Sequence, residues 1–255
     1  MKLCHPGRER FGSRIPVAYM KIRGRRECKA CGNRWSYYET GSVSCPACGR
    51  LESVGTEEER SLHTATAATL DLTPIRSAIG SEPLRRLAER ANDRTREFTR
   101  GYGFIDGGGL RELDDTYLAA MELRALGSEL ARRMEIDDDE RLYFTSLLRA
   151  DEGDRPSPEE VPTSVRPIRG LAYANAVKEY RSDLRTYLQE HPDRAVDGTI
   201  ERLSNHVKRI RALEGDVDPA AAERLVDAAR AVGRYLAEED ETALLGAEER
   251  LDALS

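Results

Sequence analysis

The sequence predicts two unlike parts: a small β module built around cysteine residues, followed by a larger all-α bundle. Four of the five cysteines form two Cys-x-x-Cys pairs near the N-terminus. Net charge changes sign along the chain, and the apolar residues of its C-terminal three quarters recur at helical spacing. The length of 255 residues is enough for one or two domains with a buried core.

Charge divides the chain into a basic head and an acidic body. Residues 1–19 carry a net charge of +3 and residues 20–55 a net charge of +4. Residues 56–255 carry −13, which brings the whole chain to −6. An asymmetry of this size indicates two physically different parts.

The N-terminal segment predicts no export or membrane insertion. It lacks the apolar stretch of a secretory signal, and no apolar run reaches the roughly 18 residues that a membrane span requires. We therefore expect a cytoplasmic protein without membrane contact. Because the segment MKIRG at 20–24 is typical of a protein start, we expect residues 1–19, with the unpaired Cys4, to be a disordered extension or a start-codon artefact.

The cysteine pairs predict one structural zinc ion. Two pairs separated by thirteen residues supply four thiolates, which suits a closed tetrahedral zinc site without an open position for catalysis. Two disulfides, or iron in a rubredoxin-like site, are the alternatives; a reducing compartment disfavours the disulfides. The predicted ligands are Cys28, Cys31, Cys45 and Cys48.

The residues around these pairs predict two knuckles joined by a hairpin. Gly32 and Gly49 directly follow the pairs, where glycine permits a left-handed backbone conformation. The aromatic segment 34–39 predicts a strand, Thr40-Gly41 a reversal, and 42–44 a returning strand.

Residues 20–55 resemble a zinc ribbon of the transcription-factor-IIB type, with CKACG and CPACG as its two knuckles. The resemblance implies a structural Zn²⁺ held by the four cysteines. The predicted fold class is thus a small N-terminal β zinc ribbon with rubredoxin-like knuckles, followed by an all-α helical bundle.

Basic and aromatic residues beside the knuckles form a candidate contact surface. Alternating cations before the first knuckle would share one face of a strand, as a nucleic-acid-binding ribbon requires. Alternatively, they offset the formal charge of −2 on a zinc tetrathiolate, and Trp35 belongs to a small core or a protein-docking face. The candidate contact residues are Lys21, Arg23, Arg25, Arg26 and Trp35.

The remainder predicts a linker over residues 56–70 and an irregular helical domain over residues 71–255. The linker is polar without apolar periodicity, and we expect its His63 to be solvated. A glycine-rich loop at 101–109 and a proline-rich segment at 151–167 predict connections. Four consecutive acids at 137–140 predict a helix start rather than a metal site. Helices are predicted near 73–75, 84–98, 113–134, 137–148, 169–190, 194–213, 219–237 and 239–254.

The whole chain from residue 20 onward resembles an uncharacterised haloarchaeal family, through MKIRGRREC, LDLTPIRSAI and LDDTYLAAMELR. That resemblance implies a zinc ribbon fused to a helical domain and brings no known activity. No catalytic constellation stands out in the sequence, so we expect a non-enzymatic protein-interaction or scaffold module with a protein partner. The alternative is a nucleic-acid-binding regulator, in transcription or RNA metabolism, that uses the basic ribbon. The oligomeric state stays open.

Overall fold

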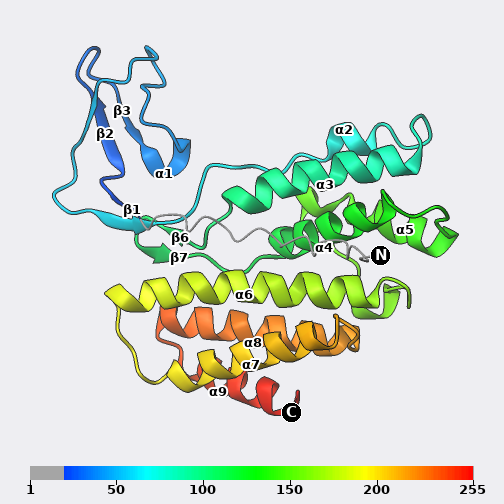
Figure 1. The fold of residues 1–255 in the computed structure, drawn as a ribbon. Coiled ribbons are helices and arrows are strands. Elements are labelled where there is room, and N and C mark those ends of the chain that lie inside the picture. Colours follow the sequence, from blue (N-terminus) through cyan, green and yellow to red (C-terminus); the bar gives the residue numbers. More distant parts are fainter. Residues whose placement is uncertain (1–19, 255) are drawn as a thin grey trace, which may run out of the picture.

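The computed structural model describes residues 20–254 and shows a small cysteine-containing unit at one end of an elongated helical body (Figure 1). We call residues 20–55 the ribbon and residues 71–254 the helical body. The expected extension 1–19, including Cys4, lies outside the described residues. Small strands followed by a helical region agree with the predicted fold class.

The ribbon is a three-stranded antiparallel sheet with strand order β3-β2-β4. Its strands are β2 (Arg25–Cys28), β3 (Arg34–Ser36) and β4 (Ser53–Gly55). The predicted strand over 34–39 is wrong in its second half, where the chain forms the short helix α1 (Tyr37–Thr40). The predicted returning strand at 42–44 is also wrong, because the third strand lies after the second knuckle.

The segment expected to be a linker contains a strand that pairs with the ribbon. Strand β5 (Ser61–His63) pairs antiparallel with β1 (Met20–Ile22), the first described strand. Leu62 and His63 are buried, so the expectation of a solvated His63 is wrong. The glycine-rich connection contains a small hairpin, β6 (Ile105–Asp106) with β7 (Gly109–Leu110).

The helical body follows the predicted order of helices with shifted ends. Asp137 caps its helix by accepting a hydrogen bond from the Glu140 N–H, and this capping box confirms that the acidic run starts a helix. The two short 3₁₀ turns (Ala150–Glu152 and Pro158–Glu160) interrupt the proline-rich connection. The helices are α2 (Thr73–Arg76), α3 (Leu84–Gly101), α4 (Asp115–Leu130), α5 (Asp138–Leu147), α6 (Arg166–Glu190), α7 (Asp197–Ala212), α8 (Pro219–Glu238) and α9 (Glu241–Asp252).

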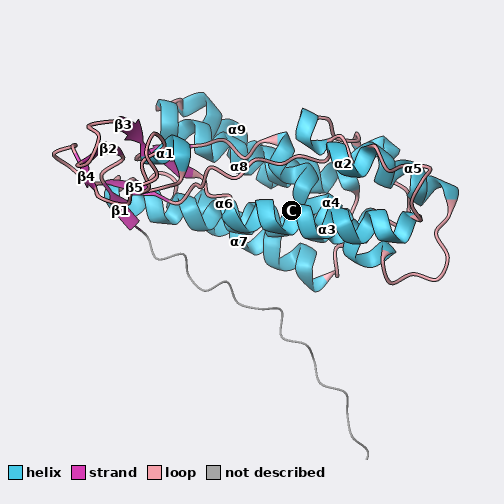
Figure 2. Ribbon diagram, turned by 90° about the horizontal axis from the view of Figure 1, so that it is seen from above, coloured by secondary structure: helices cyan, strands magenta, loops and turns pink. Residues whose placement is uncertain are grey.

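Two hydrophobic clusters stabilise the body, and α4 contributes to both. One face of α4 supplies Tyr117 and Leu118 to a cluster shared with α6, α7, α8 and α9. Ala119 and Leu123 enter a second cluster with α2, α3 and α5. Figure 2 shows the strands gathered at one end and α5 at the other. Within residues 20–254, none of the helices is both long and apolar enough to cross a membrane.

Candidate metal centre

The two knuckles bring all four predicted cysteines to one point. Their Sγ atoms lie within 4.8 Å of one another. The Sγ atoms of Cys28 and Cys48 are 3.7 Å apart, and those of Cys31 and Cys45 are 3.6 Å apart. A regular tetrahedron with metal–sulfur bonds of about 2.3 Å has edges of about 3.8 Å. The four sulfurs are therefore spaced as ligands of one metal ion and could hold it.

Backbone geometry explains why each knuckle ends in glycine. The Gly32 N–H donates to the Cys28 carbonyl at 2.9 Å, and the Gly49 N–H donates to the Cys45 carbonyl at 2.8 Å. Both glycines have φ near 72°, the left-handed region that the sequence predicted. A Cβ at either glycine would meet no heavy atom within 4 Å, so the positive φ, rather than crowding, requires glycine.

Electrostatics favour a cation between these sulfurs. Amide N–H groups of Cys31 and Ala30 lower the pKa of Cys28. Burial raises the pKa of Cys45, but the amides of Cys48 and Ala47 outweigh it and lower the pKa to about 6. Despite a hydrogen bond with the backbone of Asn33, the neighbouring cysteine sulfurs raise the pKa of Cys31 to about 12. A cation between the sulfurs would offset the repulsion that raises the pKa of Cys31.

Comparison with known proteins connects the ribbon and the body. The profile of a family of unknown function, DUF7117, matches residues 20–251. The chain belongs to this family. The match spans both cysteine pairs and extends into α9, so ribbon and helical body belong to one family pattern. No curated protein and no solved structure matches the chain.

The predicted basic strip is divided between two sheets. Lys21 lies in β1, whereas Arg25 lies in β2, so the expectation of one shared strand face is wrong. Lys21 forms an ion pair with Glu190 at 2.6 Å, and the Arg23 guanidinium donates to the Glu58 carbonyl. Lys21 and Arg23 therefore both have partners within the chain.

Two further candidates, Arg26 and Trp35, also have internal partners. The Arg26 guanidinium donates to the Ser53 hydroxyl at 3.0 Å, and Trp35 Nε1 donates to the Ser42 carbonyl at 3.0 Å. Arg25 is the freest, with 82 % of its side chain exposed and Glu57 at 4.0 Å.

Three exposed aliphatic residues in or near the edge strand β4 were not predicted from the sequence. Among the described residues, eight large hydrophobic side chains are exposed, and three of them lie in this small ribbon: Val43, Leu51 and Val54. The Ser53 hydroxyl donates to the Val43 carbonyl at 2.8 Å, which places that loop beside β4. The sequence signal was an aliphatic residue directly after the second knuckle, in a module too small to bury it.

A buried histidine fixes the ribbon against the body. The rings of Tyr37 and Tyr38 contact His63, and the Gly107 N–H donates to His63 Nδ1 at 3.3 Å. Asp106 Oδ1 lies 3.3 Å from the same nitrogen. Burial lowers the pKa of His63, and the opposing effect of Asp106 does not overcome it. The neutral imidazole is thus the form that this junction holds.

Acid is expected to loosen this junction. Since the pKa of His63 is lower in the folded protein than in the unfolded chain, His63 stabilises the fold above its unfolded pKa of about 6.5. That contribution is lost as the pH falls toward the folded pKa. Urea unfolding of the wild type should show a smaller free energy of unfolding at acidic than at neutral pH. His63→Gln should flatten that dependence, and an unchanged pH profile in the variant would contradict the role.

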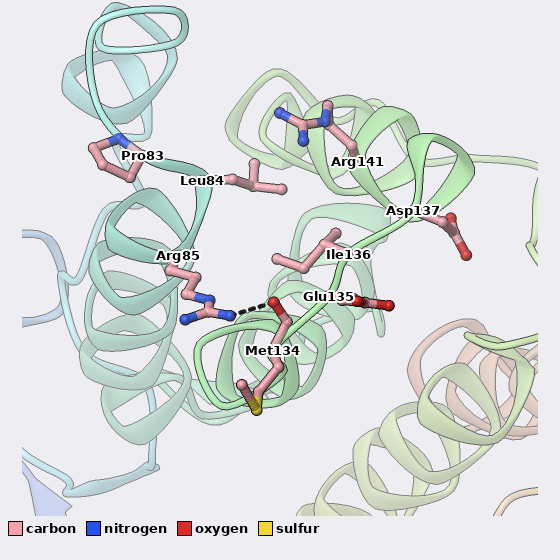
Figure 3. Close-up of a pocket in the computed structure, with 8 residues that line it drawn as sticks. All are labelled: Pro83, Leu84, Arg85, Met134, Glu135, Ile136, Asp137 and Arg141. Atoms are coloured by element: carbon pink, nitrogen blue, oxygen red, sulfur yellow. Dashed lines mark hydrogen bonds between the residues drawn. The ribbon is translucent and has the colours of Figure 1, made fainter.

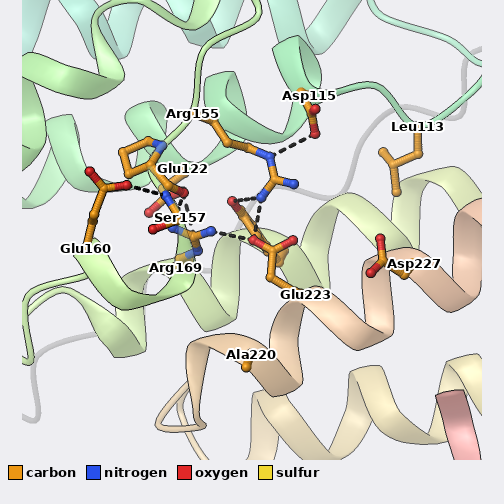
Figure 4. Close-up of polar contacts among 12 residues, drawn as sticks. Leu113, Asp115, Glu122, Arg155, Ser157, Glu160, Arg169, Ala220, Glu223 and Asp227 are labelled. Carbon is orange, nitrogen blue, oxygen red and sulfur yellow. Dashed lines mark hydrogen bonds and ion pairs between the residues drawn. The ribbon is translucent and has the colours of Figure 1, made fainter.

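A buried charge network lies at the centre of the body (Figure 4). Arg169 on α6 is fully buried and forms ion pairs with Glu223 on α8 and, at 3.9 Å, with Glu122 on α4. Its Nη1 donates to the Tyr143 hydroxyl and to the Pro156 carbonyl, both at 3.0 Å. The network therefore joins four helices and the proline-rich connection.

Sequence reasoning missed Arg169, although a signal was present. Arg169 occupies the same face of α6 as Ala172, Tyr173 and Ala176, all of which are buried. A cation on an apolar stripe requires buried partners. Burial raises the pKa of Glu122 in spite of the nearby Arg169.

A surface hollow near the far end of the body is lined by residues of mixed character (Figure 3). It measures about 660 Å³ and lies between the start of α3 and the loop that joins α4 to α5. The Arg85 guanidinium donates to the Met134 carbonyl at 2.5 Å, and the Met134 side chain is 91 % exposed. The hollow is an open surface feature distant from the cysteines.

Proposed function

We propose that this protein is a non-enzymatic interaction module in which a zinc-stabilised ribbon, carried on a helical body, docks to a protein partner. The observation that carries the proposal is the aliphatic surface of the ribbon. Val54 lies in the edge strand β4, Leu51 comes shortly before it, and the Val43 carbonyl accepts a hydrogen bond from Ser53 of the same strand; all three aliphatic residues are exposed. Clustered exposed aliphatic side chains are typical of protein contact sites.

Zinc is the metal that fits this donor set best. Four thiolates in a closed tetrahedron are the structural arrangement of zinc, and an all-protein ligand set leaves no position for substrate. When bound, the ion would cross-link the two knuckles through Cys28, Cys31, Cys45 and Cys48. The chain's own part is to position the four sulfurs with the two glycine turns and to direct amide N–H groups at Cys28 and Cys45.

The internal contacts of the ribbon favour a protein partner over nucleic acid. Stacking on single-stranded bases requires exposed aromatic rings. Trp35, Tyr37 and Tyr38 are all half-buried: Trp35 donates its N–H within the ribbon, while Tyr37 and Tyr38 pack on His63. The resemblance to transcription-factor-IIB ribbons and the haloarchaeal relationship stay predictions, as do the absence of enzymatic activity and the cytoplasmic location.

Co-purification of partner proteins with the full-length, zinc-loaded chain tests the proposal. We expect a stoichiometric protein to be recovered from the source organism by the wild type and lost in Leu51→Asp/Val54→Asp. Leu245→Asp is the matched control, because Leu245 is 61 % exposed on α9. Binding of duplex DNA or RNA that weakens with salt and disappears in Arg23→Glu/Arg25→Glu/Arg26→Glu would support the nucleic-acid alternative instead.

A further inference from the structure

The tip of the ribbon combines cations with aliphatic side chains. We call Lys29, Arg50 and Leu51, flanked by Val43 and Val54, the tip surface. The Lys29 N–H donates to the Glu52 carbonyl at 2.9 Å, which places Lys29 beside the segment that carries Arg50 and Leu51. Within the part of the chain that the structure describes, neither Lys29 nor Arg50 forms an ion pair, and Leu51 is 70 % exposed.

The opposite end of the molecule carries a groove of complementary character. It has a volume of about 590 Å³ and lies between α5 and the proline-rich connection. Four carboxylates line it, those of Asp137, Asp139, Glu159 and Glu160, and its lining contains no lysine or arginine. Leu142, also in the lining, is 69 % exposed. We call this feature the acidic groove.

Two of the four groove carboxylates cap helices, and the other two do not. Asp137 and Glu160 accept backbone hydrogen bonds in capping boxes. Asp139 and Glu159 are exposed and form no ion pair among residues 20–254. An occupant that carries positive charge and an apolar side chain would complement these two acids and Leu142.

We infer that the tip surface of one copy docks in the acidic groove of a second copy. The inference rests on the proposed function, that the ribbon is a docking module, and it names the partner. The ribbon and α5 lie at opposite ends of the molecule in both views, so one copy cannot make this contact with itself (Figures 1 and 2). Two antiparallel copies exchange the contact twice, which closes the assembly as a two-fold dimer.

Charge complementarity favours a second copy of this chain as the occupant. In the proposed contact, Lys29 and Arg50 pair with Asp139 and Glu159. Leu51 packs against Leu142. Paired charges at such a contact fix its register and make the association sensitive to salt.

Sedimentation equilibrium of the zinc-loaded full-length protein tests the inference. The wild type should be dimeric at low ionic strength and dissociate as salt is added. Lys29→Glu/Arg50→Glu and Asp139→Lys/Glu159→Lys should each raise the dissociation constant about tenfold or more. Lys208→Glu/Arg211→Glu, which reverses two exposed cations on α7, should leave it unchanged.

Mixing the two charge-reversed variants provides the decisive outcome. Each variant alone sets like charges against one another in both contacts, whereas a one-to-one mixture restores attraction in both. The mixture should therefore form a heterodimer that neither variant forms with itself. A wild type that stays monomeric at about 1 mM, or a dimer that ignores these substitutions, overturns the inference. In either case, capture of another protein through Leu51 would leave the proposed function standing.

Discussion

Cys28→Ser is expected to abolish metal binding and unfold the ribbon while leaving the helical body folded. Zinc binding and folding share one free energy in small modules of this kind, on the order of 10 kcal/mol. Apart from strand pairing and the packing of Tyr37 and Tyr38 on His63, the ribbon has little else to stabilise it, because neither hydrophobic cluster of the body contains a ribbon residue. Metal analysis should fall from one zinc per chain in the wild type to far below one in the variant.

Trp35 allows the two parts to be followed separately. It is the chain's single tryptophan, and it lies in the ribbon with its N–H bound to the Ser42 carbonyl. Its fluorescence should shift to the red in Cys28→Ser, and also when a chelator strips the wild type, while the helical circular dichroism persists. Cys4→Ser is the matched control and should keep the metal. Full zinc content in Cys28→Ser, or an absorption spectrum of iron in the wild type, would contradict the proposed centre.

The metal site could be predicted from the sequence because its pattern is local. Each cysteine pair with its glycine is a single turn, so spacing alone predicts where the sulfurs point. The strand expected at 34–39 failed for a non-local reason: Tyr38 turns into α1 and packs against Gly24 and His63. A Cβ on Gly24 would lie 2.0 Å from the Tyr38 ring. This tertiary contact overrides the β-propensity of the aromatic residues.

The body shows the same division between local and distant causes. The acids at 137–140 were assigned correctly, because carboxylates in the first turn stabilise a helix N-terminus through capping hydrogen bonds and the helix dipole. The join between ribbon and body was missed because β1 and β5 are separated by about forty residues of sequence that show no pairing signal. The partner of Arg169 could not be predicted for the same reason, since Glu223 is 54 residues away.

Arg169→Met is expected to destabilise the helical body by about 3–5 kcal/mol, because removing one partner leaves buried carboxylates without compensation. Glu122 is fully buried, and among residues 20–254 Glu223 would retain only the cation of Arg155. Urea unfolding followed by circular dichroism measures the loss. Arg166→Met on the same helix is the matched control, because Arg166 is exposed, and it should change the free energy of unfolding little.

Restoring neutrality is expected to recover part of that loss. In Arg169→Met/Glu122→Gln no charge remains at Glu122, so the double variant should be more stable than the sum of the two single changes predicts. The pH dependence has a defined sign. Burial already raises the pKa of Glu122 above its unfolded value, and removing Arg169 raises it further. The Arg169→Met variant therefore gains stability as the pH falls and Glu122 takes up a proton. The loss in free energy of unfolding caused by Arg169→Met should therefore shrink from neutral to mildly acidic pH. A loss that is constant with pH and strictly additive with the effect of Glu122→Gln would show that the network's charges are not coupled.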